Sequence, residues 1–362
     1  MKKKTLLTVL VTMLALSVSA QIKIEVSETV ELMSILSRTA GFQEYHTDKA
    51  GQYTKDTEAW FSPYKEHPII SYYQGLRSDH SVSYDAVMSM AIHLEIQQGK
   101  VCFLGEKSDL DERWENVDID DFMLRLNQFY TDTRFHAFFE QQSNFYQEGL
   151  KSFEENVMSY FHQDWYGQFY GTESTERFHI VIGFTYGDLN NGVARQLKGH
   201  PKEVFAICGY TLSPTTNQPA WDAALLIHEF NHSFVNPLLD NPTNVALLQK
   251  IGMKLFQLSQ PEMEKQAYRG WETVINESVV RAAVFIYMLD NKLVSKSTSN
   301  FMFNETWRKG FRWLPELVTS LRYYASHREQ YPTLNDYYPE IARCLNSYFT
   351  TEAERLNKPL QQ

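Results

Sequence analysis

Two histidines and a glutamate are spaced for one face of an α-helix in the pentapeptide H-E-x-x-H, which holds His228, Glu229 and His232. Residues four apart lie one turn apart on the same face, so the two imidazoles can bind one metal ion. The glutamate between them is placed to act as a general base. The apolar run at 221–227 and the later Pro237 predict a buried helix that ends about a turn after His232.

A catalytic zinc site of this kind takes a third ligand from the protein and leaves one position open. Glu277 is the best candidate, because it lies in an apolar helical run at 271–289 where a carboxylate is costly to bury without a purpose. Asn276 and Arg281 are placed to orient it from behind. Two alternatives remain open: Glu277 forms an internal ion pair with Arg281, or Glu272 is the ligand instead.

An H-E-x-x-H helix followed by an Asn-Glu pair on a later helix resembles the gluzincin branch of zinc metallopeptidases, which includes thermolysin-like and aminopeptidase-like enzymes. Position 238 is leucine, so the third histidine of the metzincin pattern is missing. The resemblance covers residues 221–289, and its 45-residue interval between the second histidine and the glutamate is longer than the roughly twenty typical of the two named groups. The zinc ligands that it implies are His228, His232 and Glu277, with Glu229 as the base.

Over most of its length the chain also resembles a family of secreted bacterial proteins that carry an uncharacterised domain. That family has the same helical first half, the same H-E-x-x-H segment and the same Asn-Glu segment. This second resemblance implies export but supplies no substrate.

Two segments ahead of the metal helix, 178–184 and 203–210, have the β-branched and aromatic composition of strands. The turn-rich stretch 187–192 joins them. In gluzincins a small sheet precedes the metal helix, and its edge strand binds extended substrate by backbone pairing. Residues 190–192 therefore belong either to a plain hairpin turn or to such a substrate-binding edge.

The first half of the chain is mostly helical in its pattern. Residues 27–40 predict an amphipathic helix that Ser27 caps, and residues 83–98 predict another. The dense aromatic side chains recur at spacings of three and four, which is typical of a helical core. Residues 104–121 are acidic and predict a loop with short helical pieces.

The sequence as a whole predicts a mostly helical α+β protein. An N-terminal helical region, residues 21–170, is expected to pack on a zincin-like catalytic half, residues 171–362, in which a small sheet comes before the metal helix. Near the end of the chain, residues 291–300 predict a polar linker. Two closing helical segments follow at 307–326 and 336–350, which Pro315 and Pro339 are expected to interrupt.

Residues 1–20 have the organisation of a secretory signal peptide, with three lysines, a short apolar run and small residues before Gln21. We expect export to the periplasm or the cell exterior, and no later segment is long and apolar enough to cross a membrane. Without those lysines, 31 basic residues oppose 44 acidic ones, a net charge of −13 that disfavours nucleic acid as a partner. Three cysteines allow at most one disulfide, so the hydrophobic core must carry the stability.

These patterns predict a secreted Zn²⁺-dependent metallopeptidase that hydrolyses a peptide or protein substrate, with Glu229 as general base. An alternative is an exported, non-catalytic, zinc-containing module that binds proteins or glycans. A glycoside hydrolase is a third class, although no carboxylate pair is marked out by spacing. A peptidase needs a further donor for the developing oxyanion, and the candidates are Tyr287, Tyr268, Tyr186 and His327.

Overall fold

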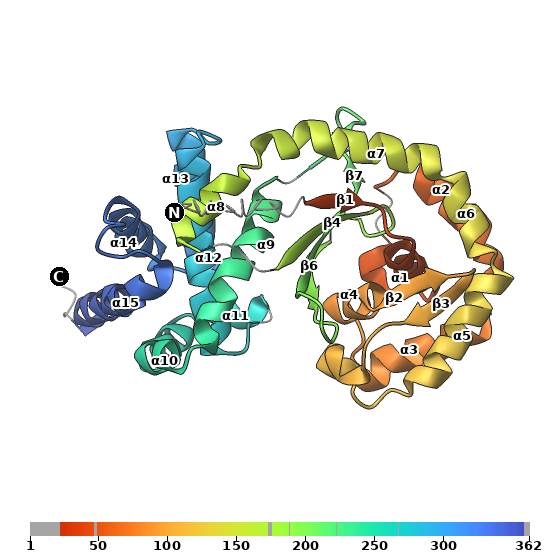
Figure 1. The fold of residues 1–362 in the computed structure, drawn as a ribbon, viewed down its shortest axis with the longest axis horizontal. Helices are drawn as coiled ribbons and strands as arrows, with labels where there is room; N and C mark the ends of the chain where they lie inside the picture. Colours follow the sequence, from red (N-terminus) through yellow and green to blue (C-terminus); the bar gives the residue numbers. More distant parts are fainter. Residues whose placement is uncertain are drawn as a thin grey trace, which may run out of the picture.

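The computed structural model describes residues 22–46, 49–172, 176–187, 189–221, 223–266 and 268–357, and its fold is α+β and mostly helical (Figure 1). The predicted signal peptide lies outside the described residues. The helices are α1 (Glu28–Thr39), α2 (Gln52–Phe61), α3 (Pro68–His80), α4 (Asp85–Ile92), α5 (Ile119–Asp132), α6 (Phe135–Gln141), α7 (Ser143–Asn156), α8 (Gln163–Tyr170), α9 (Ala223–Val235), α10 (Pro242–Leu258), α11 (Gln260–Lys265), α12 (Trp271–Asp290), α13 (Lys296–Arg308), α14 (Leu314–Ser326) and α15 (Leu334–Asn357). The strands are β1 (Lys23–Glu25), β2 (Leu94–Gln97), β3 (Lys100–Phe103), β4 (Arg177–Gly183), β5 (Asn190–Arg195), β6 (Glu203–Gly209), β7 (Thr211–Leu212) and β8 (Pro219–Ala220). None of these helices is long and apolar enough to cross a membrane.

A four-stranded sheet lies at the centre of the molecule, with the strand order β1-β4-β6-β5. Strands β1, β4 and β6 are parallel, and β5 runs antiparallel to β6 at the edge of the sheet. Helices α1 and α4 contact one face, and α9 contacts strands β5 and β6 (Figure 1). Successive side chains of a strand point to opposite faces of the sheet, so each face can hold its own layer of helices. The sheet thus separates the N-terminal helices from α9, the helix that carries the pentapeptide.

The buried apolar side chains form two clusters that meet at α9. The first cluster is built by the N-terminal helices and the sheet, and it ends with Leu226. The second is built by α8 and the helices from α9 to α15, and it includes Ile227 and Phe230. Helix α9 is therefore anchored in both clusters. The division of the chain into units near residue 171 stays a prediction.

Several predicted elements are confirmed. Helix α1 begins after Ser27, whose hydroxyl accepts a hydrogen bond from the backbone N–H of Val30 at 3.4 Å. Helix α9 ends at Val235, and a short 3-10 helix that contains Pro237 follows it. The predicted ligand helix is α12, and the two predicted strands are β4 and β6. Cys208 is buried, and none of the three cysteines, which all lie in the described ranges, forms a disulfide.

The single helix predicted at 83–98 is wrong. Helix α4 ends at Ile92, and residues 94–103 form the antiparallel hairpin of β2 and β3. At its tip, Gln98 and Gly99 have φ angles of 51° and 76°. Positive φ at both central residues is what a two-residue type I′ hairpin turn requires, and it stops the helical pattern there.

The stretch at 187–192 is not a plain turn between two neighbouring strands, because Asn190–Arg195 forms strand β5. All six of its residues pair with β6, from Asn190 opposite Cys208 to Arg195 opposite Glu203. Asparagine and glycine have low strand propensity, so the pairing with β6 determines the conformation here.

Two predictions near the end of the chain are also corrected. The polar linker predicted at 291–300 ends early, because Ser295 caps helix α13 by accepting a hydrogen bond from the N–H of Thr298 at 3.2 Å. A break near Pro315 is confirmed, since that proline lies in the first turn of α14. Pro339 instead lies inside α15. Interior proline costs about 3 kcal/mol, and burial of Tyr338 and Ile341 on either side offsets that cost.

Candidate metal centre

Helices α9 and α12 bring His228, His232 and Glu277 together as a group that could hold a metal ion. The two imidazole Nε2 atoms are 3.1 Å apart. His232 Nε2 lies 3.3 Å from Glu277 Oε1, and His228 Nε2 lies 3.6 Å from Glu277 Oε2. The carboxylate is buried, and the imidazoles are partly buried. A single face of α9 and one turn of α12 thus supply all three groups.

The separations of these atoms fit a tetrahedral zinc site. Zinc binds imidazole nitrogen and carboxylate oxygen at about 2.0–2.2 Å, so two ligand atoms on one tetrahedral ion lie about 3.3 Å from each other. The Nε2 atoms of the two histidines are 3.1 Å apart and Oε1 of Glu277 lies 3.3 Å from His232, both close to that value, and one ligand atom from each of the three residues lies within 4.8 Å of the others. Two nitrogens and one oxygen are also the donor set that catalytic zinc accepts.

The groups around the triad hold its side chains in place. Asn236 Oδ1 lies 3.0 Å from His232 Nδ1 and accepts its proton, which leaves the Nε2 lone pair toward the triad. Arg281 Nη2 lies 2.9 Å from Glu277 Oε2 and 3.2 Å from the hydroxyl of Tyr268. Glu277 therefore forms an ion pair with Arg281 and also contacts both histidines. Its two predicted roles, as partner of Arg281 and as candidate metal ligand, are compatible.

The charges of the triad shift one another. Burial disfavours the ionised form of Glu277, but hydrogen bonds from His228 and His232 and the charge of Arg281 hold its pKa well below the ordinary value. Burial likewise opposes the charged imidazole of His232, yet Glu277 raises the pKa of His232 through a hydrogen bond and its charge. Glu277 and His232 therefore each favour the charged form of the other, and a metal cation would compete with the proton for the His232 imidazole.

The side chain of Glu229 packs against Gly192 of strand β5, and both residues line a cavity of about 230 Å³ together with His232. A Cβ atom on Gly192 would lie 2.2 Å from Oε2 of Glu229, which is closer than any stable contact. Within the described part of the chain, the Glu229 carboxylate has neither a hydrogen bond nor an ion pair. It is thus available as a proton acceptor beside the triad.

The remaining wall of the cavity comes from the sheet edge and the end of α9. The residues are Val193, Ala194, Lys202, Val204, Ser233 and Asn236. Lys202 is held by an ion pair of 2.8 Å with Glu176. A space between a helix and the edge strand of a sheet suits an extended chain better than a compact ligand.

The structure shows which of the other predicted site residues lie near the triad and which do not. Tyr268 lies beside the triad, through Arg281. The hydroxyl of Tyr287 donates a hydrogen bond to the carbonyl of Tyr160 and accepts one from the N–H of His162. The hydroxyl of Tyr186 donates to the side-chain oxygen of Asn191. The remaining two candidates, His327 and the alternative ligand Glu272, are both exposed.

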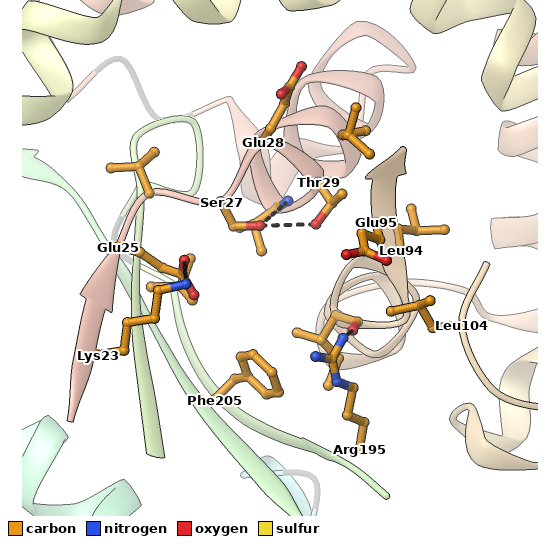
Figure 2. A pocket seen from close by; sticks show the side chains of 15 residues that line it. Lys23, Glu25, Ser27, Glu28, Thr29, Leu94, Glu95, Leu104, Arg195 and Phe205 are labelled. Carbon is orange, nitrogen blue, oxygen red and sulfur yellow. Dashed lines mark hydrogen bonds and ion pairs between the residues drawn. The ribbon is translucent and has the colours of Figure 1, made fainter. Parts of the chain in front are cut away.

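A second cavity, of about 340 Å³, lies between the sheet and the start of α1 (Figure 2). Its charged groups are satisfied within the protein. Lys23 pairs with Glu25 at 2.6 Å, and Arg195 bonds to Glu203 at 2.8 Å. Phe205 lines this cavity and its neighbour Val204 lines the one beside Glu229, so the two cavities lie on opposite faces of the sheet. In the described ranges, the His228, His232 and Glu277 group is the one cluster of metal-ligating side chains.

Two contacts of the site were not predicted from the sequence, namely those of Asn236 with His232 and of Gly192 with Glu229. Asn236 lies four positions after His232, and this helical spacing is a signal in the sequence that could have indicated their contact. Gly192 approaches Glu229 only because β5 pairs with β6 and α9 packs over that edge. No local pattern carries that second relationship.

Comparison with known proteins gives a family but no activity. A family profile described as a domain of unknown function, DUF4932, matches residues 22–344. No curated protein and no solved structure is significantly similar to the chain. The matched region includes the sheet, the N-terminal helices, and helices α9 and α12, which carry His228, His232 and Glu277. This protein therefore belongs to the DUF4932 family.

Proposed function

We propose that this protein is a secreted zinc-dependent metallopeptidase with a gluzincin-like site. The observation that carries the proposal is the placement of Glu229, which has no partner among the described residues, between the triad and a strand edge. A purely structural zinc site has four protein ligands and no need of a free carboxylate next to it. Zinc held by His228, His232 and Glu277 would supply the Lewis acidity that amide hydrolysis needs.

The chain's own groups account for the rest of the reaction. Glu229 takes a proton from the attacking water and passes it to the leaving amine. The outer edge of β5 would offer backbone groups to an extended peptide, and Gly192 on this strand leaves room for the Glu229 carboxylate. Tyr268 is a donor for the developing oxyanion, because its hydroxyl lies next to the triad. Burial first, and then the charge of Glu277, raise its pKa to about 12, so it keeps its proton at neutral pH.

The test combines metal content with one substitution. The exported protein, purified without chelator, is expected to hold close to one zinc per chain by elemental mass spectrometry. It should cleave members of a library of internally quenched peptides, and Glu229→Gln should keep the zinc while hydrolysis falls by at least about 10²-fold. Glu272→Gln is the matched control, since Glu272 is exposed at the start of α12. Full hydrolysis by Glu229→Gln would contradict the assignment. A zinc-bound protein that cleaves no peptide would favour the non-catalytic binding module.

A further inference from the structure

Both oxygens of Glu277 face the imidazoles. Oε1 lies 3.3 Å from His232 and Oε2 lies 3.6 Å from His228. Neither separation prevents the carboxylate from using both oxygens on one ion. What distinguishes the two oxygens is Arg281, which lies 2.9 Å from Oε2.

Arg281 is fixed on several sides. Its guanidinium carbon lies 4.7 Å from the ring centre of Phe311, which is fully buried. Its Nη2 also donates to the hydroxyl of Tyr268 at 3.2 Å. The side chain is 17 % exposed and that of Glu277 is 9 % exposed, so the pair is largely removed from water. A guanidinium that is stacked, hydrogen-bonded and desolvated keeps its position better than a solvated one.

We propose that Arg281 is a positioning residue that retains Oε2 of Glu277 and so restricts this carboxylate to a single coordinating oxygen, Oε1. The inference rests on the proposed zinc site and adds a property to it. With one oxygen from Glu277 and one nitrogen from each histidine, the protein supplies three ligand atoms and the fourth position stays open. With both oxygens engaged, that position would be partly filled by the protein itself.

The bond to Tyr268 gives Arg281 a second effect. The Tyr268 hydroxyl accepts a hydrogen bond from Arg281 and directs its own proton toward the carboxylate of Glu277. Arg281 thus orients the donor as well as the ligand. Removal of the guanidinium is expected to release both groups together.

The experiment uses cobalt(II) in place of zinc in the full exported chain, because visible absorption of cobalt reports its coordination number. We expect the wild-type protein to give the intense spectrum of a four-coordinate ion. Arg281→Met, which keeps the length and loses the charge, should bind cobalt with a severalfold weaker, five-coordinate spectrum. The matched control is Arg312→Met, since Arg312 also pairs with a glutamate, Glu262 at 2.7 Å, and stacks on an aromatic ring, Trp307.

The outcomes separate the two proposals. If wild-type protein and Arg312→Met take up no cobalt, the metal centre itself is wrong and the role of Arg281 falls with it. If both bind and Arg281→Met has the wild-type spectrum, the role of Arg281 alone is wrong. Should Arg281→Met fail to fold, a crystal structure of the zinc-loaded wild-type protein decides. One Glu277 oxygen on zinc and the other on Arg281 supports the proposal, and two oxygens shared equally by zinc overturn it.

Discussion

Gly192 on β5 and Glu229 on α9 are so close that a methyl group on Gly192 would overlap the glutamate carboxylate, with its carbon 2.2 Å from Oε2. The Glu229 carboxylate can therefore occupy this position only because Gly192, a residue of strand β5, has no side chain. This relationship makes Gly192 a sensitive probe of Glu229, because it can be changed without altering any of the candidate ligands His228, His232 and Glu277.

Gly192→Ala is expected to push the Glu229 carboxylate away from the strand and to lower kcat by about tenfold or more, since a positioned general base contributes about 10²–10⁴-fold. Zinc content should stay the same, because all three ligands keep their places. Peptide hydrolysis and elemental analysis measure the two effects. Gly75→Ala is the control, because a Cβ atom there has nothing within 4 Å. An unchanged kcat for Gly192→Ala would show that the carboxylate is not needed where the structure has it.

Asn236→Ala is expected to weaken zinc binding by about 10–100-fold, because His232 loses the acceptor that fixes its ring and its tautomer. Competition with a chromophoric zinc chelator measures the affinity. Asn236→Asp keeps an oxygen at this position and should bind zinc almost as well as the wild-type protein does. Equal losses in the two variants would mean that Asn236 contributes packing rather than a hydrogen bond.

Tyr268→Phe is expected to lower kcat by about 10²–10³-fold with little change in KM, since the hydroxyl is proposed to act on charge that develops in the transition state. Tyr287→Phe is the matched control. Its hydroxyl bonds to the backbone at Tyr160 and His162, so its loss should cost about 1 kcal/mol of stability and leave kcat unchanged. A larger effect on kcat from Tyr287 than from Tyr268 would reverse the assignment.

The stabilisation of the protein by zinc is expected to grow as pH rises. The raised pKa of His232 contributes stability to the metal-free protein at low pH, and this contribution is lost as pH rises through that pKa. The lowered pKa of Glu277 contributes stability that is lost as pH falls through it, so the metal-free pair is most favourable between the two values. Zinc must displace the proton of His232. Below the raised pKa of His232, the affinity for zinc is therefore expected to fall about tenfold for each unit by which the pH is lowered.

The difference in Tm between zinc-loaded and chelator-treated protein, measured across a pH series, tests this expectation. This Tm difference should be small at pH values well below the raised pKa of His232, increase with pH, and become constant above that pKa. His232→Ala should abolish it at every pH. A difference that does not depend on pH would mean that zinc binds elsewhere.

The elements that sequence predicted best are those with long apolar periodicity. Helix α12 and strands β4 and β6 each have many buried side chains in a regular pattern, so pattern and packing agree. The hairpin β2–β3 was missed because its short strands adjoin α4 and the apolar residues run on without a proline. Strand β5 was left open because its Asn and Gly residues favour turns, and only its pairing with β6 makes it a strand.

The proximity of the three candidate ligands was predictable for a different reason. Two of them share one helical turn, and the third is a carboxylate in an otherwise apolar helix, so chemistry and local pattern coincide. The carboxylate's partner Arg281 also followed from spacing along α12. The free state of Glu229, its contact with Gly192 and the choice among four possible donors depend on how the sheet packs against α9. These relationships need the three-dimensional structure.

Leu226 and Ile227 are consecutive residues of α9, yet their side chains belong to different hydrophobic cores. A helix that is bound into both cores links their stabilities, so neither core can lose its packing at α9 without loosening the other. The pentapeptide begins at the next residue, directly beside this junction. A cavity made in either core is therefore expected to shift His228 through one turn of backbone, and with it the arrangement of His228, His232 and Glu277.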